Sequence, residues 1–442
     1  MSNQWLLSLV LFAGICSVQS FVSLSKTQTL GNPHLCFARK QSEDETSLVA
    51  PIMISRRDAL VTAAGLAALV ASAPASIAAD TSVPIKASWS SVDGLNSNSD
   101  DFVSFDMSAY KAMEQDPTRT PLFRKAIEQR IAAAPSESLV ALDLGTGPVA
   151  LFAIIAAELG AKQVYAIEAN PAVAASARDV IRKAGWTDVI TVLEGFSTDI
   201  TLPEKADFCI AEICGSVATE EGAYATIRDA HTRFLKEPEN AANWIPSRIQ
   251  TYAAPASYGL HNLFGPPEFD WMKLNGEPVR FNCRDPGLQL LADPVLVEDL
   301  SFCSILSKAQ DDLMNKQQDL AFIIDAKRME QNQPLLYDEF RRGNSSPAES
   351  ERLASETAHS LSGIALWPRL FLGDDIMIDS RGYPSGTPQR SHWQTVLPIM
   401  SGRPVGGLIG GEKVVVALNF DVPKSVTKSS KYSMDGRVEF GL

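Results

Sequence analysis

The chain has 442 residues, of which 45% are hydrophobic and 21% are charged, so it can build two globular domains with sizeable cores. Its formal net charge of −13 at pH 7 argues against nonspecific binding to nucleic acid and makes basic peptides or small cations natural electrostatic partners. Many soluble proteins are acidic without having such partners, so the charge alone selects none.

The first 79 residues have the pattern of targeting segments. Residues 5–18 form an apolar stretch that is too short for a bilayer span and ends in small residues before Phe21, which predicts a signal peptide over residues 1–20. The Ser- and Thr-rich residues 21–55 resemble a plastid transit segment. Two arginines then precede an alanine-rich run, which predicts a twin-arginine export signal over residues 56–79.

This layered leader resembles those of algae whose plastids are of secondary origin. The resemblance implies the thylakoid lumen as destination, with the plastid stroma if the twin-arginine segment is unused, and a mature chain that begins near Asp80. The alternative is a membrane anchor over residues 59–79, but an Ala-rich run with Pro74 inserts poorly. We therefore expect no stable membrane association after processing.

Four of the six cysteines follow the leader, and their spacing indicates no metal site. Cys209, Cys214, Cys283 and Cys303 form no CxxC pair and have no paired histidine. A disulfide framework is also not indicated for a domain of this size.

Residues 101–245 have the strand and helix alternation of a doubly wound parallel sheet. The polar residues 80–100 before it are predicted to be a linker. Helical spacing of apolar residues predicts one or two helices over residues 109–133. The expected strands that follow are residues 139–142, 163–167, 189–193 and 207–210, and the expected helices are residues 150–159, 172–183 and 223–235.

Residues 246–442 are predicted to form an antiparallel β-barrel or β-sandwich. The β-like runs, separated by Gly, Pro and Asp, are residues 249–253, 294–297, 364–372, 376–378, 395–399 and 414–420. Residues 308–358, rich in Gln, Lys and Glu, are predicted to be a helical insertion that forms a surface lid or arm.

A glycine-rich loop joins the first strand of the α/β domain to its helix. Gly145 and Gly147 allow a tight turn and a close backbone approach to a ligand. Together with Ala150 they also fit the dinucleotide fingerprint GxGxxA, so the loop alone leaves the cofactor open.

Neighbouring residues favour S-adenosylmethionine (SAM) over a dinucleotide. Pro148 removes a backbone N–H where a pyrophosphate needs donors, and Asp143 suits the ammonium of a methionine moiety. Glu168 ends the second strand, where a carboxylate accepts hydrogen bonds from ribose hydroxyls, in SAM and NAD alike. Ser197 and Thr198 follow the third strand and are placed to contact an adenine ring, although ordinary loop chemistry explains them equally well.

Two glutamates, Glu212 and Glu221, stand nine residues apart after the strand that ends at Ile210. This spacing resembles the double-glutamate loop of protein arginine methyltransferases. Other landmarks follow in the same order over residues 101–420: Met113, Asp116 and Arg119 in an N-terminal helix, Trp244 to Arg248 before the barrel, and Ser391-His392-Trp393 in place of the family's Thr-His-Trp.

The resemblance implies a Rossmann-like SAM-binding domain followed by a β-barrel, and it assigns the site. Glu212 and Glu221 would grip the acceptor guanidinium, and bidentate carboxylates suit that planar cation. His392, paired with Asp116, would accept a proton or orient Glu221. Arg119 would meet the SAM carboxylate.

The sequence also departs from the family. Val149 replaces the third glycine of the family's DxGxGxG, and Ile213 begins a divergent glutamate loop in which Glu220 could stand in for Glu221. Tyr110 and Met113 belong to the cofactor side, with Tyr110 where a histidine is common. Residues 252–300 are short for a dimerisation arm, which leaves the family's dimer open.

Other functions stay open beside the leading hypothesis of methyl transfer to arginine in a protein or peptide substrate. The first is a SAM-dependent methyltransferase of another acceptor, such as a small amine. The second is a noncatalytic interaction protein that keeps the fold. A nicotinamide oxidoreductase is disfavoured by Pro148 and the glutamate pair, and a nucleic-acid methyltransferase by the charge.

Edman or mass-spectrometric sequencing of the mature N-terminus tests the leader. We expect a start near Asp80, because cleavage after the alanine-rich run removes both export signals. A mature start within residues 21–55 would contradict export to the lumen.

Overall fold

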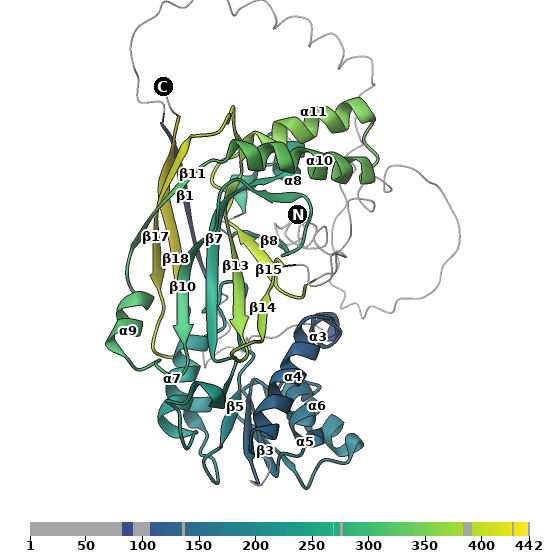
Figure 1. Ribbon diagram of the computed structural model, residues 1–442, viewed down its shortest axis with the longest axis vertical. Helices are drawn as coiled ribbons and strands as arrows, with labels where there is room; N and C mark the ends of the chain where they lie inside the picture. The colour runs from purple at the N-terminus through teal and green to yellow at the C-terminus, as the bar shows by residue number, and fades with distance from the viewer. Residues whose placement is uncertain are drawn as a thin grey trace, which may run out of the picture. The chain divides into compact units, whose positions relative to one another are not determined.

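The computed structural model describes residues 82–91, 107–134, 138–267, 269–274, 277–382, 391–426 and 428–440 (Figure 1). The targeting segments predicted within residues 1–79 lie outside this part. In the part described, no helix is both long and apolar enough to cross a membrane.

The first half is the expected doubly wound sheet, with five parallel strands in the order β4-β3-β2-β5-β6. Its central strand β2 is buried at every position, because helices cover both faces of a parallel sheet. The strands are β2 (Val140–Leu144), β3 (Gln163–Glu168), β4 (Ile190–Glu194), β5 (Phe208–Ile210) and β6 (Trp244–Ile245). The helices are α3 (Met107–Glu114), α4 (Arg119–Ala132), α5 (Leu151–Glu158), α6 (Pro171–Ala184) and α7 (Ala223–Arg233).

The strand order creates a crevice at the carboxyl edge of the sheet. Strand β2 pairs with β3 on one side and with β5 on the other, so the chain order reverses there. Ligands of doubly wound sheets bind at such a switch point. The loops after β2 and β5 therefore meet, although about 70 residues separate them in sequence.

The second half is antiparallel, as predicted. A seven-stranded sheet has the order β10-β7-β13-β15-β8, with β14 on β13 and β9 on β7, and a four-stranded sheet has the order β1-β18-β17-β11. The first sheet comprises β7 (Arg248–Tyr258), β8 (Val279–Asn282), β9 (Leu288–Leu290), β10 (Val295–Ser301), β13 (Gly363–Phe371), β14 (Met377–Asp379) and β15 (Gln394–Leu397). The second comprises β1 (Ser82–Ser90), β11 (Gln318–Ile323), β17 (Lys413–Asp421) and β18 (Lys431–Glu439), and a small ladder joins β12 (Ser360–Leu361) to β16 (Val405–Gly406).

The predicted linker over residues 80–100 is wrong for its first half. Strand β1 pairs with β18 along its whole length, from Ser82 opposite Glu439 to Ser90 opposite Lys431. Its buried side chains Ile85 and Trp89 lie on the face that packs into the core. Apolar and polar residues alternate here, as is usual in a half-buried strand. The signal is weak because several of these residues are serines, which are also common in linkers.

The predicted helical insertion over residues 308–358 is only partly helical. Helix α9 (Lys308–Met314) is followed by β11, which pairs with β17 and so belongs to the four-stranded sheet. Only α10 (Ala326–Arg342) and α11 (Pro347–Ala358) form a separate helical hairpin, with a small core of its own that includes Leu336, Phe340 and Leu353. The hairpin packs on α8 (Gly259–Leu263).

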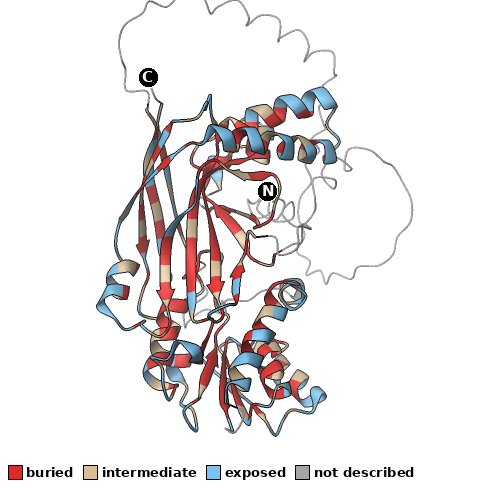
Figure 2. Ribbon diagram, viewed as in Figure 1, coloured by how far each residue is buried: buried red, intermediate tan, exposed pale blue. Residues whose placement is uncertain are grey.

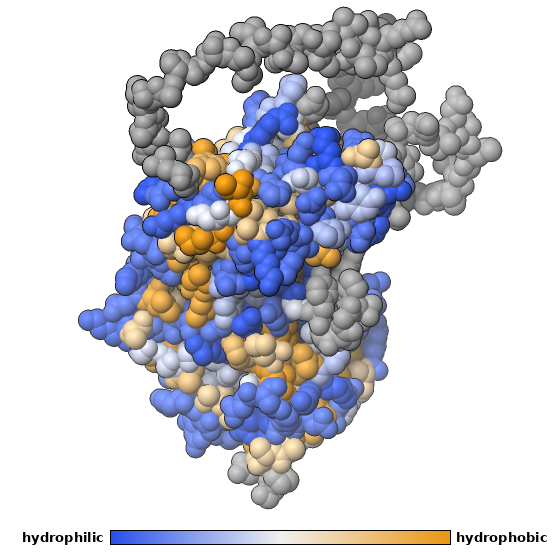
Figure 3. Space-filling view, turned by 45° about the horizontal axis from the view of Figure 1, so that its top comes forward, coloured by the Kyte–Doolittle hydropathy of each residue, from blue (hydrophilic) through white to orange (hydrophobic). Residues whose placement is uncertain are grey.

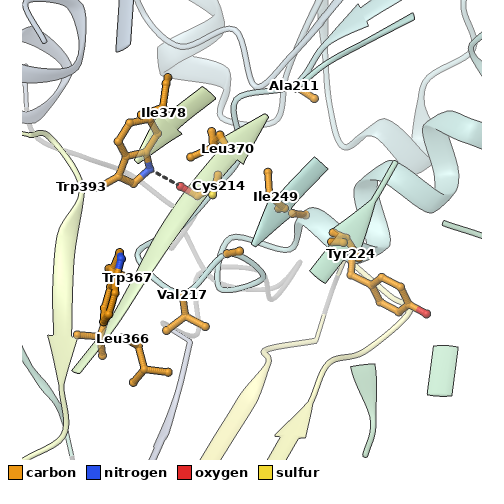
Figure 4. Close-up of a cluster of buried hydrophobic side chains, with 14 of the residues drawn as sticks. Ala211, Cys214, Val217, Tyr224, Ile249, Leu366, Trp367, Leu370, Ile378 and Trp393 are labelled. Carbon is orange, nitrogen blue, oxygen red and sulfur yellow. Dashed lines mark hydrogen bonds between the residues drawn. The ribbon is translucent and has the colours of Figure 1, made fainter. Parts of the chain in front are cut away.

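One continuous core links the two halves of the described chain. Buried residues concentrate along the strands, whereas the outer faces of α9, α10 and α11 are exposed (Figure 2). Around the glutamate loop the core contains Cys214, Val217, Ile249 and Trp393 (Figure 4). Hydrophilic residues cover most of the surface seen in Figure 3, with hydrophobic residues between them.

Trp89 tests the structural role of β1. It is 6% exposed and stacks on Tyr432 with ring centroids 5.2 Å apart. We expect Trp89→Ala to lower the free energy of unfolding by about 3–5 kcal/mol, because a large buried ring is lost. Urea denaturation measures this. Lys86→Ala on the exposed side of the same strand is the control, with an expected change within about 0.5 kcal/mol; equal effects would contradict a structural role.

Candidate functional site

A cavity of about 380 Å³ lies at the crevice between the loops after β2 and β5. Its walls come from both halves of the described chain. The Rossmann-like half contributes Tyr110, Met113, Arg119, Gly145, Gly147, Glu168, Ser197, Glu212 and Glu221, and the antiparallel half contributes His392, Trp393, Gln394 and Val426.

The glycine loop contains left-handed backbone conformations, which glycine adopts without a steric cost. Gly145 and Gly147 have φ of 72° and 68°, in the left-handed region. A Cβ atom on Gly145 would lie 3.0 Å from Ile213 Cγ2, so the loop passes close to the glutamate loop. Ala150 has φ of 45° and begins α5 without a side-chain cap. The loop therefore presents bare backbone to the cavity.

Asp143 does not line the cavity, contrary to the expectation that it meets a ligand ammonium. It is 1% exposed, and its Oδ2 accepts hydrogen bonds from Thr146 Oγ1 at 2.6 Å and from the Ala153 backbone N–H at 3.1 Å. Burial raises the pKa of Asp143 to about 6. The side chain still belongs to β2 and faces α5, so it fixes the loop and the helix instead of a ligand.

Glu168 lies where the sequence placed it, in the cavity wall at the end of β3. Its two carboxylate oxygens accept hydrogen bonds from the backbone N–H groups of Gly147, at 3.1 Å, and Asn170, at 2.9 Å. Burial raises its pKa. Ser197 also lines the cavity, and within the described chain its buried Oγ has no hydrogen-bond partner. Thr198, expected beside it, is not in the wall.

Arg119 forms an ion pair with Glu212. Its Nε lies 2.9 Å from Glu212 Oε2, and its Nη2 donates to the same oxygen. The two side chains are only 7% and 8% exposed. The guanidinium also lies 4.7 Å from the centroid of the Phe152 ring and donates to the Met113 carbonyl. Arg119, expected to meet the carboxylate of SAM, is paired in the structure with a carboxylate of the protein.

Glu221 lines the same cavity and has no cation of its own within the described chain. Burial, with the charges of Glu212 and Glu220, raises its pKa to about 8. Its neighbour Glu220 forms an ion pair with Arg280 and accepts a hydrogen bond from the Val217 N–H. Glu220 is therefore committed to the structure, whereas Glu221 can receive a cation from the cavity.

His392 and Asp116 come together although 276 residues separate them. His392 Nδ1 lies 3.0 Å from Asp116 Oδ2, and Asp116 also accepts hydrogen bonds from the backbone N–H groups of Thr118, Arg119 and His392. Burial alone would raise the pKa of Asp116, but the hydrogen bond from the His392 side chain and those from the backbone outweigh it and hold the pKa below its usual value. Burial lowers the pKa of His392, so the pair consists of a neutral imidazole and a carboxylate.

Several residues that shape the site carried no signal in the sequence. Arg280, Glu298 and Tyr432 lie on β8, β10 and β18 and reach the glutamate loop only through the sheet packing. Val426, between β17 and β18, also lines the cavity, as do Gly222 and Thr226. No local motif marks such residues, because their partners are 60 or more positions away.

Comparison with known proteins gives a consistent family match. Residues 95–241 match the model of the family described as PRMT5 arginine-N-methyltransferase. Over 149 residues the chain is 31% identical to a probable protein arginine N-methyltransferase 6 of Arabidopsis thaliana, which covers 34% of this chain and 33% of that protein. Protein arginine N-methyltransferase PRMT10 of the same plant is 31% identical over 156 residues, covering 34% and 39%. The match thus spans between 33% and 39% of these relatives' length.

The fold is shared over a longer stretch. A solved structure of Arabidopsis thaliana protein arginine methyltransferase 10 superposes with a TM-score of 0.52 and 18% identity, covering 75% of this chain and 97% of that one. This likeness extends beyond residues 95–241 and so includes part of the antiparallel half. It shows the common architecture of the two halves.

The raised pKa of Glu221 predicts that its substitution increases the stability of the fold, by an amount that depends on pH. Between the ordinary value of 4.5 and the folded-state value of about 8, the folded protein holds a proton that the unfolded chain releases. Stability from this group is therefore present below pH 4.5 and lost as the pH rises through 8. We expect Glu221→Gln to be more stable than the wild type at pH 8.5, by on the order of 5 kcal/mol, and to be nearly equal at pH 4, where both states of the wild type hold the proton. Denaturant unfolding at both pH values checks this; a difference independent of pH would contradict it.

Proposed function

We propose that this chain, which residues 95–241 place in the protein arginine N-methyltransferase family, transfers a methyl group from SAM to the guanidinium of arginine in protein substrates. The observation that carries the proposal is the cavity in which the glycine loop, Glu212 and Glu221 face one another. A cofactor loop and an acceptor site for a cation thus share one space.

The residues around the cavity fit SAM. The bare backbone of Gly145 and Gly147 admits the methionine moiety, Glu168 offers a carboxylate to the ribose hydroxyls, and the unpartnered Ser197 hydroxyl offers a polar contact to the adenine side. Arg119 supplies a guanidinium for the cofactor carboxylate and shares it with Glu212. When bound, the cofactor would supply an electrophilic methyl group, and the protein would hold that methyl group in position beside the acceptor.

The acceptor side fits a guanidinium. A guanidinium is planar, always charged and weakly nucleophilic, so two carboxylates can both orient it and draw its charge away from the attacking nitrogen. Within the described chain Glu221 lacks an internal cation and its pKa is raised to about 8, so it keeps a proton at neutral pH until an incoming cation favours its ionised form. Positioning and electrostatics account for most of the rate acceleration expected here.

The His392 and Asp116 pair stands beside this site and can take up a proton. The imidazole is neutral because burial lowers its pKa, and the ionised Asp116 orients it through Nδ1. The transferred methyl replaces an N–H proton of the acceptor, which must leave the site. A neutral imidazole in the cavity wall is a suitable proton acceptor.

The proposed location in the plastid, with the thylakoid lumen as destination, is compatible with this fold. Strand β1 begins at Ser82, two residues after the expected mature start at Asp80. Removal of residues 1–79 would therefore leave every described strand intact. The location stays a proposal that the mature N-terminus tests.

Transfer of radiolabelled methyl from SAM to an arginine-containing basic peptide tests the activity. We expect labelling of that peptide and none of a matched peptide in which lysine replaces arginine, because the two carboxylates fit a planar guanidinium. Glu221→Gln and Glu212→Gln should lower kcat by on the order of 100-fold or more. Mass spectrometry of the product distinguishes monomethyl, symmetric and asymmetric dimethyl arginine.

Glu158→Gln is the matched control, because Glu158 forms an exposed ion pair with Arg124 outside the cavity wall. It should retain wild-type activity. Labelling of small amines instead of peptides would favour the alternative acceptor. Binding of SAM without labelling of any arginine substrate would contradict catalysis and favour a noncatalytic interaction protein.

A further inference from the structure

The loop that carries the two glutamates is held chiefly by the antiparallel half of the protein. Trp393 Nε1 donates a hydrogen bond to the Cys214 carbonyl at 3.0 Å (Figure 4), and the Gln394 N–H donates to Ser216 Oγ at 3.3 Å. These contacts fix the first part of the loop. The second part, which leads to Glu221, is fixed by a different set of groups.

Glu298 lies at the centre of this second set. It is 1% exposed and accepts hydrogen bonds from the hydroxyls of Thr219 and Thr251. Thr251 Oγ1 in turn accepts from the Ala218 N–H at 2.9 Å, and Tyr432 Oη lies 3.2 Å from Thr219 Oγ1. Each threonine hydroxyl has one proton, which it gives to Glu298, so the direction of every bond follows: Tyr432 donates to Thr219, and Ala218 donates to Thr251.

A carboxylate in this place is costly for stability. Within the described chain no lysine, arginine or histidine forms an ion pair with Glu298, and burial raises its pKa to about 7. An apolar side chain would avoid the desolvation of a buried charge. What a carboxylate provides, and an apolar group does not, is a fixed acceptor that orients the two threonine hydroxyls.

We propose that Glu298 is a positioning residue of the acceptor site, which acts through Thr219 to fix the peptide units that carry Glu220 and Glu221. Thr219 immediately precedes Glu220, whose carboxylate is anchored by Arg280. Glu221 is thereby aimed into the cavity from a rigid support. The proposal rests on the proposed function, because it assigns Glu221 to the acceptor.

The hydrogen bonds of Glu298 do not include the residues expected to contact the cofactor. The cofactor contacts expected from Gly145, Gly147 and Glu168 lie on the loops after β2 and β3, and none of them bonds to Glu298 or Thr219. Loss of the Glu298 network should therefore weaken acceptor binding and turnover while SAM binding persists. A general loss of folding would impair both.

Two substitutions at Thr219 and one at Glu298 provide the test. Thr219→Val removes the hydroxyl at nearly constant volume, Thr219→Ser restores it, and Glu298→Gln removes the charge. We expect Thr219→Val and Glu298→Gln to lower kcat/KM for the arginine peptide by on the order of 10- to 100-fold, since small misplacements of a reacting group have effects of this size. The Kd for SAM should stay within about 2-fold of wild type, and Thr219→Ser should recover most of the peptide activity.

Hydrogen exchange gives a readout that needs no activity. In Thr219→Val and Glu298→Gln, the peptide covering residues 212–222 should lose protection, whereas the peptide covering residues 140–158 should not change. Glu339→Gln in α10, a substitution of a carboxylate paired with Arg342, is the control and should alter neither. Unchanged protection of residues 212–222, or wild-type peptide kinetics in Thr219→Val, overturns the positioning role. A wild-type protein that methylates no arginine substrate contradicts the proposed function, and hydrogen exchange still decides the role of Glu298.

Discussion

The structure depends on the partners that it provides for four carboxylates in and around the loop of residues 212–221. Like charges in a poorly solvated place destabilise a fold unless each has a partner. Glu212 has Arg119, Glu220 has Arg280, and Glu298 has two threonine hydroxyls. Of these four, only Glu221 has no such partner among the residues that the structure describes. Its pKa is raised by burial and by the charges of Glu212 and Glu220. Each of these carboxylates thus has a partner within the described chain except Glu221, which lines the cavity.

The two halves of the fold both position the glutamate loop, each in its own way. The parallel sheet brings the loops after β2 and β5 to one crevice, because the strand order reverses between them. The antiparallel sheets then hold the second loop in place through residues of β7, β8, β10 and β18. Since the halves share one continuous core, a change on the far side of a sheet can move Glu212 and Glu221. Strand β1, paired along β18, belongs to this support.

Much of the parallel half could be predicted from the sequence. Buried apolar runs, a glycine turn and helical periodicity are local signals, and they placed β2 to β5 and α4 to α7 within a few residues. Strand β1 was predicted to be part of a linker because it is rich in serine. Strand β11 was predicted to be part of a helical insertion because the segment around it has a helical composition. Asp143 shows the limit at the site: a carboxylate before the glycine loop suggests a ligand contact, yet the β2 pleat turns it toward α5.

The sequence by itself determined the chemistry that is available: a glycine loop, Glu168 after a strand, two glutamates nine residues apart, and a histidine that the family resemblance paired with Asp116. These follow from residue type and local spacing, which the chain carries without folding. Only the tertiary structure decided which carboxylate is free. Arg119 and Arg280 reach Glu212 and Glu220 from 93 and 60 residues away, so the pairing depends on packing. That distribution of partners leaves Glu221 as the glutamate of this loop that lines the cavity without a cation of its own within the described chain.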